Sequence, residues 1–104
     1  MVRAVEIKEA LVTYQAIHHP MEKMFTVVLD QGHEAKVTYS QQGMVLHLDY
    51  SEVPEALRGK GYGGTMMEAV LHAIEQEGFK VVPECSYIKH YMDTHKDWAH
   101  LRAS

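Results

Sequence analysis

The chain contains a single cysteine, Cys85, and this scarcity limits how the fold can be held together. One thiol forms no intrachain disulfide and supplies no pair of cysteines for a zinc site. A disulfide-stabilised secreted domain is therefore excluded. A lone thiol is typical of proteins from a reducing compartment.

Long apolar runs and an excess of basic residues are also lacking. No run of about 18 apolar residues occurs, and charges interrupt the first ten residues, so we expect a cytoplasmic protein that does not enter a membrane. Ten Lys and Arg face fourteen Asp and Glu, which gives a formal net charge of −4 with the eight histidines neutral. Binding to nucleic acid through bulk positive charge is therefore not expected.

The composition that is present describes one small globular domain. The 104 residues are 46% hydrophobic and 23% charged, which is too apolar for a disordered chain and too short for two domains. Residues 1–20 form an N-terminal extension with an ambiguous pattern. Val5 to Lys8 alternates like a strand, whereas Glu6 to Leu11 also suits a short helix, and both alternatives stay open.

Three strand patterns follow this extension. Met24–Leu29 is a β-branched and apolar run, Glu34–Tyr39 alternates, and Met44–Tyr50 alternates after a turn at Ser40–Gly43. Short turns between successive strands predict an antiparallel meander. One face of the third strand is expected to carry Met44, Leu46, Leu48 and Tyr50, and the other Val45, His47 and Asp49.

After Pro54 the period becomes helical. The spacing predicts a helix over Gly61–Gln76 that ends at Gly78, followed by a short strand at Lys80–Pro83 and a second helix at Ser86–His95. A strand, a helix and a strand in this order predict parallel pairing between the two strands. The expected fold class is α+β, with a mixed sheet. The first helix should bury Met67, Val70, Leu71 and Ile74 and turn Glu68, His72, Glu75 and Gln76 toward water.

The turn before the first helix holds four glycines: Gly59, Gly61, Gly63 and Gly64. Glycines allow positive φ and remove the Cβ atoms that would keep a ligand away from the backbone. The amides of this turn lie at a helix N-terminus, which attracts anions, and Arg58 and Lys60 add two positive charges. The pattern therefore predicts a site for a pyrophosphate.

The same turn contains the spacing G-x-G-x-x-G of dinucleotide-binding folds, and Glu84 follows the next strand. Three antiparallel strands precede the turn, however, and about 40 residues follow it. Two mononucleotide-binding halves do not fit in that length. The dinucleotide alternative is therefore disfavoured.

Two motifs carry a resemblance to a known family. The stretch from Val53 to Gly64 resembles the acyl-CoA pyrophosphate loop of the GNAT superfamily of N-acetyltransferases, R/Q-x-x-G-x-G/A, with Arg58, Gly61 and Gly63 at the matching positions. The stretch Val81–Tyr87, with the downstream His95-Lys96-Asp97-Trp98, resembles a short single-domain branch with a Pro-x-Cys motif. The resemblance covers roughly residues 22–101. In one departure, the branch has His-Thr where this chain has Tyr50-Ser51.

The resemblance implies the acyl-CoA N-acyltransferase fold, and we expect a monomer or weak homodimer. It implies acetyl-CoA or another short acyl-CoA as cosubstrate, with an amine acceptor on a small molecule or a protein lysine. The pantetheine would lie beside the end of the third strand, and the pyrophosphate on the glycine turn. The CoA-binding residues would be Tyr50, Ser51, Val53, Arg58, Gly59, Lys60, Gly61, Tyr62, Gly63, Gly64 and Lys89.

Cys85 opens the second helix, where the helix N-terminus stabilises a thiolate, although an isolated cysteine is often structural. In the resembling branch this cysteine is the proposed catalytic residue, and Tyr87 and Tyr91 are candidate general acids. The Cys85 thiolate would either take up the acetyl group or handle a proton during direct transfer to the amine. An acyl-CoA-binding module with little or no activity is the alternative function, and a thiol redox sensor is a third.

No metal site is expected. Cys85 and three histidines recur every five residues, which separates them around a helix rather than placing two ligands on one face. His47 lies on the polar face of its strand, and the pattern leaves its role open among core, solvent and acyl site. Trp98 is expected to pack the last turn onto the sheet or to border the adenine site.

Overall fold

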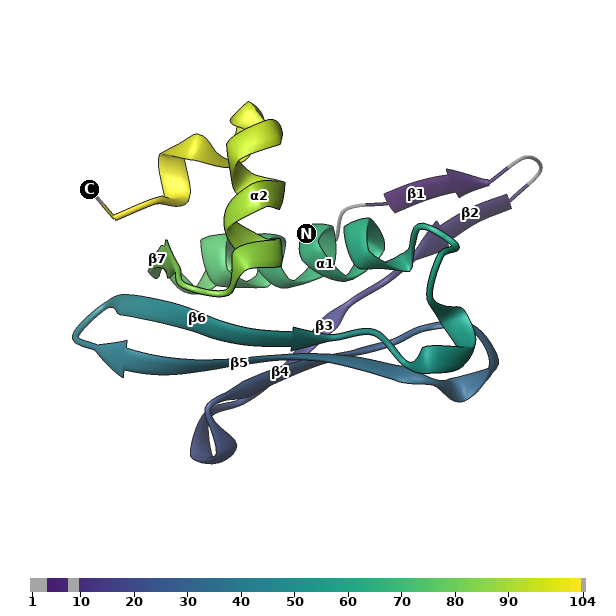
Figure 1. Cartoon of the computed structure of the whole chain (residues 1–104), viewed down its shortest axis with the longest axis horizontal. Coiled ribbons are helices and arrows are strands. Elements are labelled where there is room, and N and C mark those ends of the chain that lie inside the picture. The colour runs from purple at the N-terminus through teal and green to yellow at the C-terminus, as the bar shows by residue number, and fades with distance from the viewer. Residues whose placement is uncertain (1–3, 8–9, 104) are drawn as a thin grey trace.

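The computed structural model describes residues 4–7 and 10–103 of the chain, and in these it shows a mixed sheet of five strands with two α-helices (Figure 1). The strands follow one another across the sheet in chain order. They are β3 (Ala16–His19), β4 (Met24–Val28), β5 (Glu34–Gln42), β6 (Val45–Glu52) and β7 (Lys80–Pro83). The helices are α1 (Tyr62–Glu77) and α2 (Ser86–Thr94), and short 3-10 turns cover Pro20–Glu22, Asp30–Gly32, Glu55–Leu57 and Lys96–Leu101.

The described part of the first twenty residues contains three short strands. β1 (Ala4–Ile7) and β2 (Ala10–Thr13) pair as an antiparallel hairpin outside the main sheet, so the helical alternative for residues 6–11 is wrong over the residues described there. β3 pairs antiparallel with β4 and forms one edge of the sheet. This edge strand of four residues was missed because it is too short for an alternating pattern to stand out.

The meander expected from the sequence is confirmed, but in its last strand the alternation of buried and exposed side chains shifts by one residue part-way along. The register places Tyr39 opposite Leu48 and Thr38 opposite Tyr50, so Asp49 is an extra residue in a β-bulge. Leu46 and Leu48 are fully buried, whereas Tyr50 beyond the bulge is 49% exposed. Met44, 55% exposed, lies in the turn between the strands. The prediction that Met44 and Tyr50 share the buried face was therefore wrong.

Both α-helices cover the same face of the sheet (Figure 1). The apolar positions predicted for α1 are fully buried, and the helix ends at Gly78, whose φ of 84° gives a left-handed cap. Glu68 and His72, expected in water, are half-buried instead. The opposite face carries exposed residues such as Glu34, Lys36 and Ser40, and no helix covers it within the described part of the chain.

The strands that flank α1 separate beyond a short parallel ladder. β6 and β7 pair from Val45 opposite Lys80 to Leu48 opposite Pro83, and β6 then continues to Glu52 paired with β5 only. The Leu48 carbonyl accepts hydrogen bonds from the backbone N–H groups of both Glu84 and Cys85, at 2.9 Å each. The α2 helix therefore begins where the sheet opens.

Four antiparallel strands followed by one parallel pairing exclude the doubly wound parallel sheet of dinucleotide-binding folds. The C-terminal segment lies along the free edge of β7, where the N–H of Ala103 donates to the Val81 carbonyl at 2.8 Å. Trp98 is buried in the core against α1 rather than at a ligand site. None of the helices in residues 4–7 and 10–103 has the length and apolarity needed to cross a bilayer.

Candidate active site

A cavity of about 460 Å³ opens between the unpaired end of β6, the glycine turn and the start of α2. Three elements meet there because β6 runs on past β7 and the chain then turns back into α1. The cavity is lined by Tyr50, Ser51, Glu52, Val53, Leu57, Arg58, Gly59, Gly61, Tyr62, Gly63, Gly64, Met66 and Tyr87. Most of the residues that the sequence analysis assigned to a CoA site thus surround one space.

The glycine turn presents open backbone to this cavity. Gly59 and Gly61 have φ values of 79° and 86°, and a Cβ at either position would meet nothing within 4 Å. Gly61 caps α1, whose first N–H groups have no partner within the helix. In the described part of the chain, the N–H groups of residues 59–61 donate to no backbone acceptor. The start of α1 therefore offers several hydrogen-bond donors to an anion.

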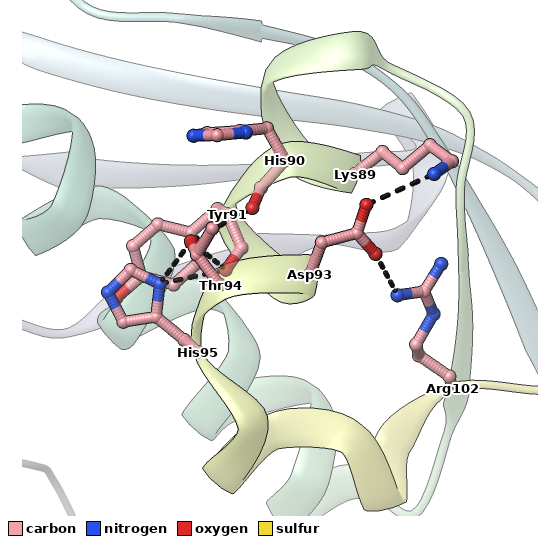
Figure 2. A network of polar contacts seen from close by, with 7 residues as sticks. All are labelled: Lys89, His90, Tyr91, Asp93, Thr94, His95 and Arg102. Carbon is pink, nitrogen blue, oxygen red and sulfur yellow. Dashed lines mark hydrogen bonds and ion pairs between the residues drawn. The ribbon is translucent and has the colours of Figure 1, made fainter.

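The three cations assigned to the site lie in different surroundings. Arg58 lines the cavity, and its Nε donates to the Val53 carbonyl at 2.9 Å, which ties the turn to the end of β6. Lys60 is exposed on the turn, outside the cavity lining. Lys89 is not among the residues that line the cavity, and it pairs with Asp93 at 3.1 Å (Figure 2). The structure brings only Arg58 of the three to the cavity wall.

A carboxylate that the sequence analysis missed binds one of the residues that line the cavity. Asp30, in the turn after β4, accepts hydrogen bonds from Tyr62 at the start of α1 and from Tyr14, the latter at 3.1 Å. The bond to Asp30 is the main cause that raises the pKa of Tyr62 to about 12, so this hydroxyl stays protonated. In the sequence, Asp30 belongs to an Asp-Gln-Gly turn and carries no sign of this long-range role.

Cys85 lies beside the cavity, half-buried, with its Sγ 3.5 Å from the Ser51 Oγ. Burial raises the pKa of the thiol. The Ser51 hydroxyl and the backbone N–H groups of Ile88, Tyr87 and Ser51 together lower this pKa by more than burial raises it. The net effect is a pKa below the ordinary cysteine value. The side chain makes no capping hydrogen bond of good geometry, so the amides at the start of α2 act on the sulfur as oriented dipoles.

The two candidate tyrosines differ in position. Tyr87 lines the cavity, is 41% exposed, and holds its hydroxyl against Gly63, where any Cβ would clash with it. Tyr91 is buried, and its hydroxyl donates to Glu68 of α1, which also accepts the Trp98 indole N–H at 2.9 Å. Burial and the Glu68 carboxylate raise the pKa of Tyr91 far above its ordinary value. Only Tyr87 is placed at the cavity.

The structure shows no group of three or more His, Cys, Asp or Glu side chains arranged for a metal ion in the residues it describes. The helical spacing of Cys85, His90, His95 and His100 disperses these side chains. His95 stacks on Tyr91 with the ring centres 3.8 Å apart, and His100 pairs with Glu75 at 2.6 Å.

Residues 24–101 match the family profile described as GCN5-related N-acetyl-transferase. The chain is also 32% identical to Protein NATD1 of Gallus gallus over 80 residues, which cover 75% of this chain and 73% of the chicken protein. It is 32% identical to Protein NATD1 of Homo sapiens over 77 residues, or 72% of this chain and 68% of the human protein. The chain belongs to the GCN5-related N-acetyltransferase family.

The fold of this GCN5-related N-acetyltransferase has a solved counterpart. An NMR structure from Staphylococcus aureus, described as GCN5-like, superposes with a TM-score of 0.63 at 20% identity, over 86% of this chain and 88% of that one. The likeness shows a shared fold. Family and fold, expected from the glycine turn and the Pro-x-Cys motif, are therefore both confirmed, and with them the assignment to a family of acetyltransferases.

Proposed function

We propose that this protein binds acetyl-CoA or another short acyl-CoA in the cavity beside β6 and transfers the acyl group to an amine. The observation that carries the proposal is the glycine turn, where open backbone and the first N–H groups of α1 face a space of about 460 Å³. A diphosphate is the part of CoA whose charge and size suit such donors. Arg58 would add positive charge, because only its Nε is used by Val53.

The end of β6 that does not pair with β7 offers a binding site for the pantetheine arm. Pairing with β7 stops at Leu48, so the backbone of Tyr50–Glu52 has no strand beside it on that side. An extended amide chain next to a free strand edge can exchange hydrogen bonds with it, as a further strand would. The thioester would then lie close to Ser51 and Cys85.

The side chains at this end of the cavity provide the proposed chemistry. In one route the Cys85 thiolate attacks the thioester carbonyl, CoA leaves, and the amine then takes the acetyl group from the sulfur. In the other the amine attacks acetyl-CoA directly and Cys85 only moves a proton. Tyr87 is the better placed acid for the leaving CoA thiolate, because the Tyr91 hydroxyl is engaged by Glu68.

Calorimetry with CoA tests the cofactor assignment. Wild-type protein should bind CoA, and Arg58→Ala should weaken binding by about tenfold or more, the usual effect of losing a charged hydrogen-bond donor. Lys96→Ala, which removes an exposed cation from the 3-10 turn after α2, is the matched control and should bind as wild type does. No binding by wild type, or undiminished binding by Arg58→Ala, would contradict the proposal.

Intact mass after incubation with acetyl-CoA separates the two routes. One added acetyl group that disappears in Cys85→Ala indicates the covalent route. An unchanged mass together with thiol release in the presence of an amine indicates direct transfer. CoA binding without thiol release under any condition indicates the binding module instead of an enzyme.

A further inference from the structure

A histidine and a carboxylate form a pair at the point where β6 and β7 separate. His47 Nδ1 lies 2.9 Å from Glu84 Oε2, and the His47 side chain is 21% exposed. His47 immediately precedes Leu48, the last residue of β6 that pairs with β7, and Glu84 immediately follows β7. The pair therefore lies next to the Leu48 carbonyl, which accepts the hydrogen bond from the N–H of Cys85.

The pair and the thiol lie on opposite faces of the sheet. Leu46 and Leu48 are fully buried under the helices, so His47 between them projects to the helix-free face. Ser51 is paired with the fully buried Val37, which places it on the helix side together with Cys85. The gap between the strands thus has Ser51 and Cys85 on one side and His47 and Glu84 on the other.

We propose that the acceptor amine reaches the acyl group through this gap from the helix-free face, and that His47, held by Glu84, removes the extra proton of the acceptor's ammonium form before the amine attacks. The inference rests on the proposed function. The helix side of the gap is occupied by the cavity wall and α2, whereas the other face has no covering helix among the described residues. With acyl-CoA in the cavity, the amine would approach from the face that carries His47.

The other charged groups around His47 are engaged with partners on neighbouring strands or segments. Asp49 accepts from Thr38 at 2.7 Å on the same face, and Glu52 lies 3.6 Å from Lys36. Lys80 of β7 donates to the His100 carbonyl, and Ser40 of β5, the partner of His47 in the ladder, is neutral. Two carboxylates, Asp49 and Glu84, therefore flank His47, which favours a cationic amine approaching it.

The step balances as a proton and an acyl transfer. The amine nitrogen forms a bond to the acetyl carbon, the carbon–sulfur bond breaks, and the pair of electrons leaves with the sulfur. Before this attack, the ammonium form of the acceptor gives one proton to His47 Nε2, because the contact with Glu84 engages Nδ1. Glu84 stabilises the imidazolium until it loses its proton to solvent. A second proton leaves the nitrogen as the new bond forms and reaches the departing thiolate through Tyr87 or water.

Two probe acceptors test the inference in the full chain: a lysine-containing peptide, whose amine is protonated at neutral pH, and a simple aniline, whose amine is not. Thiol release from acetyl-CoA is measured with each from pH 5.5 to 9. We expect His47→Gln to lower kcat with the peptide by about 100-fold, the lower end of the range for a general base, and to abolish the acid limb of its pH profile. Transfer to aniline and calorimetric CoA binding should remain close to wild type.

Glu84 is a positioning residue in this scheme, because it acts through His47. Glu84→Gln should lower kcat with the peptide while leaving KM for acetyl-CoA unchanged, and it should have no further effect in the His47→Gln background. His90→Gln removes an exposed histidine of α2 and serves as the matched control.

The outcomes separate this inference from the function on which it rests. Wild-type kcat in His47→Gln with the peptide, or an equal loss with both acceptors, overturns the role of His47 while CoA binding and transfer stand. CoA binding without thiol release to either amine overturns both acyl transfer and the inference. Absence of CoA binding overturns the cofactor assignment as well.

Discussion

At the scale of single residues, the pKa of Cys85 depends on opposing influences. Burial disfavours the thiolate, while the Ser51 hydroxyl and three backbone N–H groups favour it more strongly. Ser51 belongs to β6 and Cys85 lies at the start of α2, 34 positions further along the chain. The acidity of the thiol therefore reports whether these two elements keep their relative position.

The first prediction concerns this thiol. The rate of Cys85 alkylation by iodoacetamide, measured against pH, should have its midpoint below that of a small-molecule thiol, because thiolate is the reactive form. Ser51→Ala removes one stabilising hydrogen bond and should move the midpoint to higher pH. Cys85→Ser gives the background rate. An unchanged midpoint in Ser51→Ala would contradict the role of this contact.

A second prediction separates the two tyrosines. Tyr91→Phe leaves the half-buried Glu68 without one of its donors and should lower the free energy of unfolding by about 1–2 kcal/mol, with CoA binding unchanged. Tyr87→Phe should unfold like wild type and slow acetyl transfer, because its hydroxyl faces the cavity. Urea unfolding and thiol release measure the two effects. The reverse assignment of effects would show that the cavity tyrosine had been misidentified.

At the scale of elements, α2 holds the C-terminal segment in place. Asp93 binds Arg102 at 2.6 Å and Lys89 at 3.1 Å from its two carboxylate oxygens (Figure 2). Arg102 in turn forms an isolated parallel bridge with Val81 of β7. This contact covers the outer edge of the sheet, where a free strand would otherwise expose unpaired backbone.

The third prediction follows from the ion pairs of Asp93. Hydrogen bonds from Arg102 and Lys89 lower the pKa of this carboxyl to about 2, below its ordinary value, so they stabilise the folded chain above the ordinary pKa. That contribution should be lost as the pH falls through about 4 to 2. An NMR titration of the Asp93 carboxyl carbon should give a midpoint near 2 in wild type and a higher one in Arg102→Gln. Equal midpoints would show that Arg102 does not bind Asp93 in solution.

At the scale of the whole molecule, His18 joins three elements that are far apart in sequence. Its imidazole stacks on Phe25 with the ring centres 4.2 Å apart, contacts the Tyr39 hydroxyl, and lies 2.8 Å from Glu77 at the end of α1. The edge strand β3 is thereby fastened to both the sheet and the helix above it. Burial and Glu77 also raise the pKa of Tyr39, which keeps that hydroxyl protonated.

The fourth prediction tests this connection. His18→Ala removes two side-chain hydrogen bonds and should lower the free energy of unfolding by about 2 kcal/mol, since each is worth about 1 kcal/mol. His90→Ala, on an exposed surface of α2, should have little effect. Urea unfolding of both variants at neutral pH provides the comparison. Equal midpoints for the two variants would show that β3 is held by its backbone pairing alone.

The sequence alone was sufficient to predict the helices, most of the strands and the glycine turn. Periodicity predicted β5, β6, α1 and α2, and short apolar runs predicted β4 and β7, each to within a few residues at its ends. The Arg58-to-Gly64 stretch indicated the family for a local reason too, since the function proposed for it depends on backbone shape set by adjacent glycines. The open backbone at Gly59 and Gly61 agrees with that interpretation.

The tertiary structure decided which side chains meet, because those contacts depend on register and on packing between distant segments. The bulge at Asp49 turned Tyr50 outward and Ser51 toward Cys85, and a shift by one residue exchanges the faces of a strand. The same geometry removed Tyr91 and Lys89 from the cavity, added Asp30 behind it, and placed His47 with Glu84 at the gap. A pattern of residue types records which face a residue prefers, but it does not record the partner across the sheet.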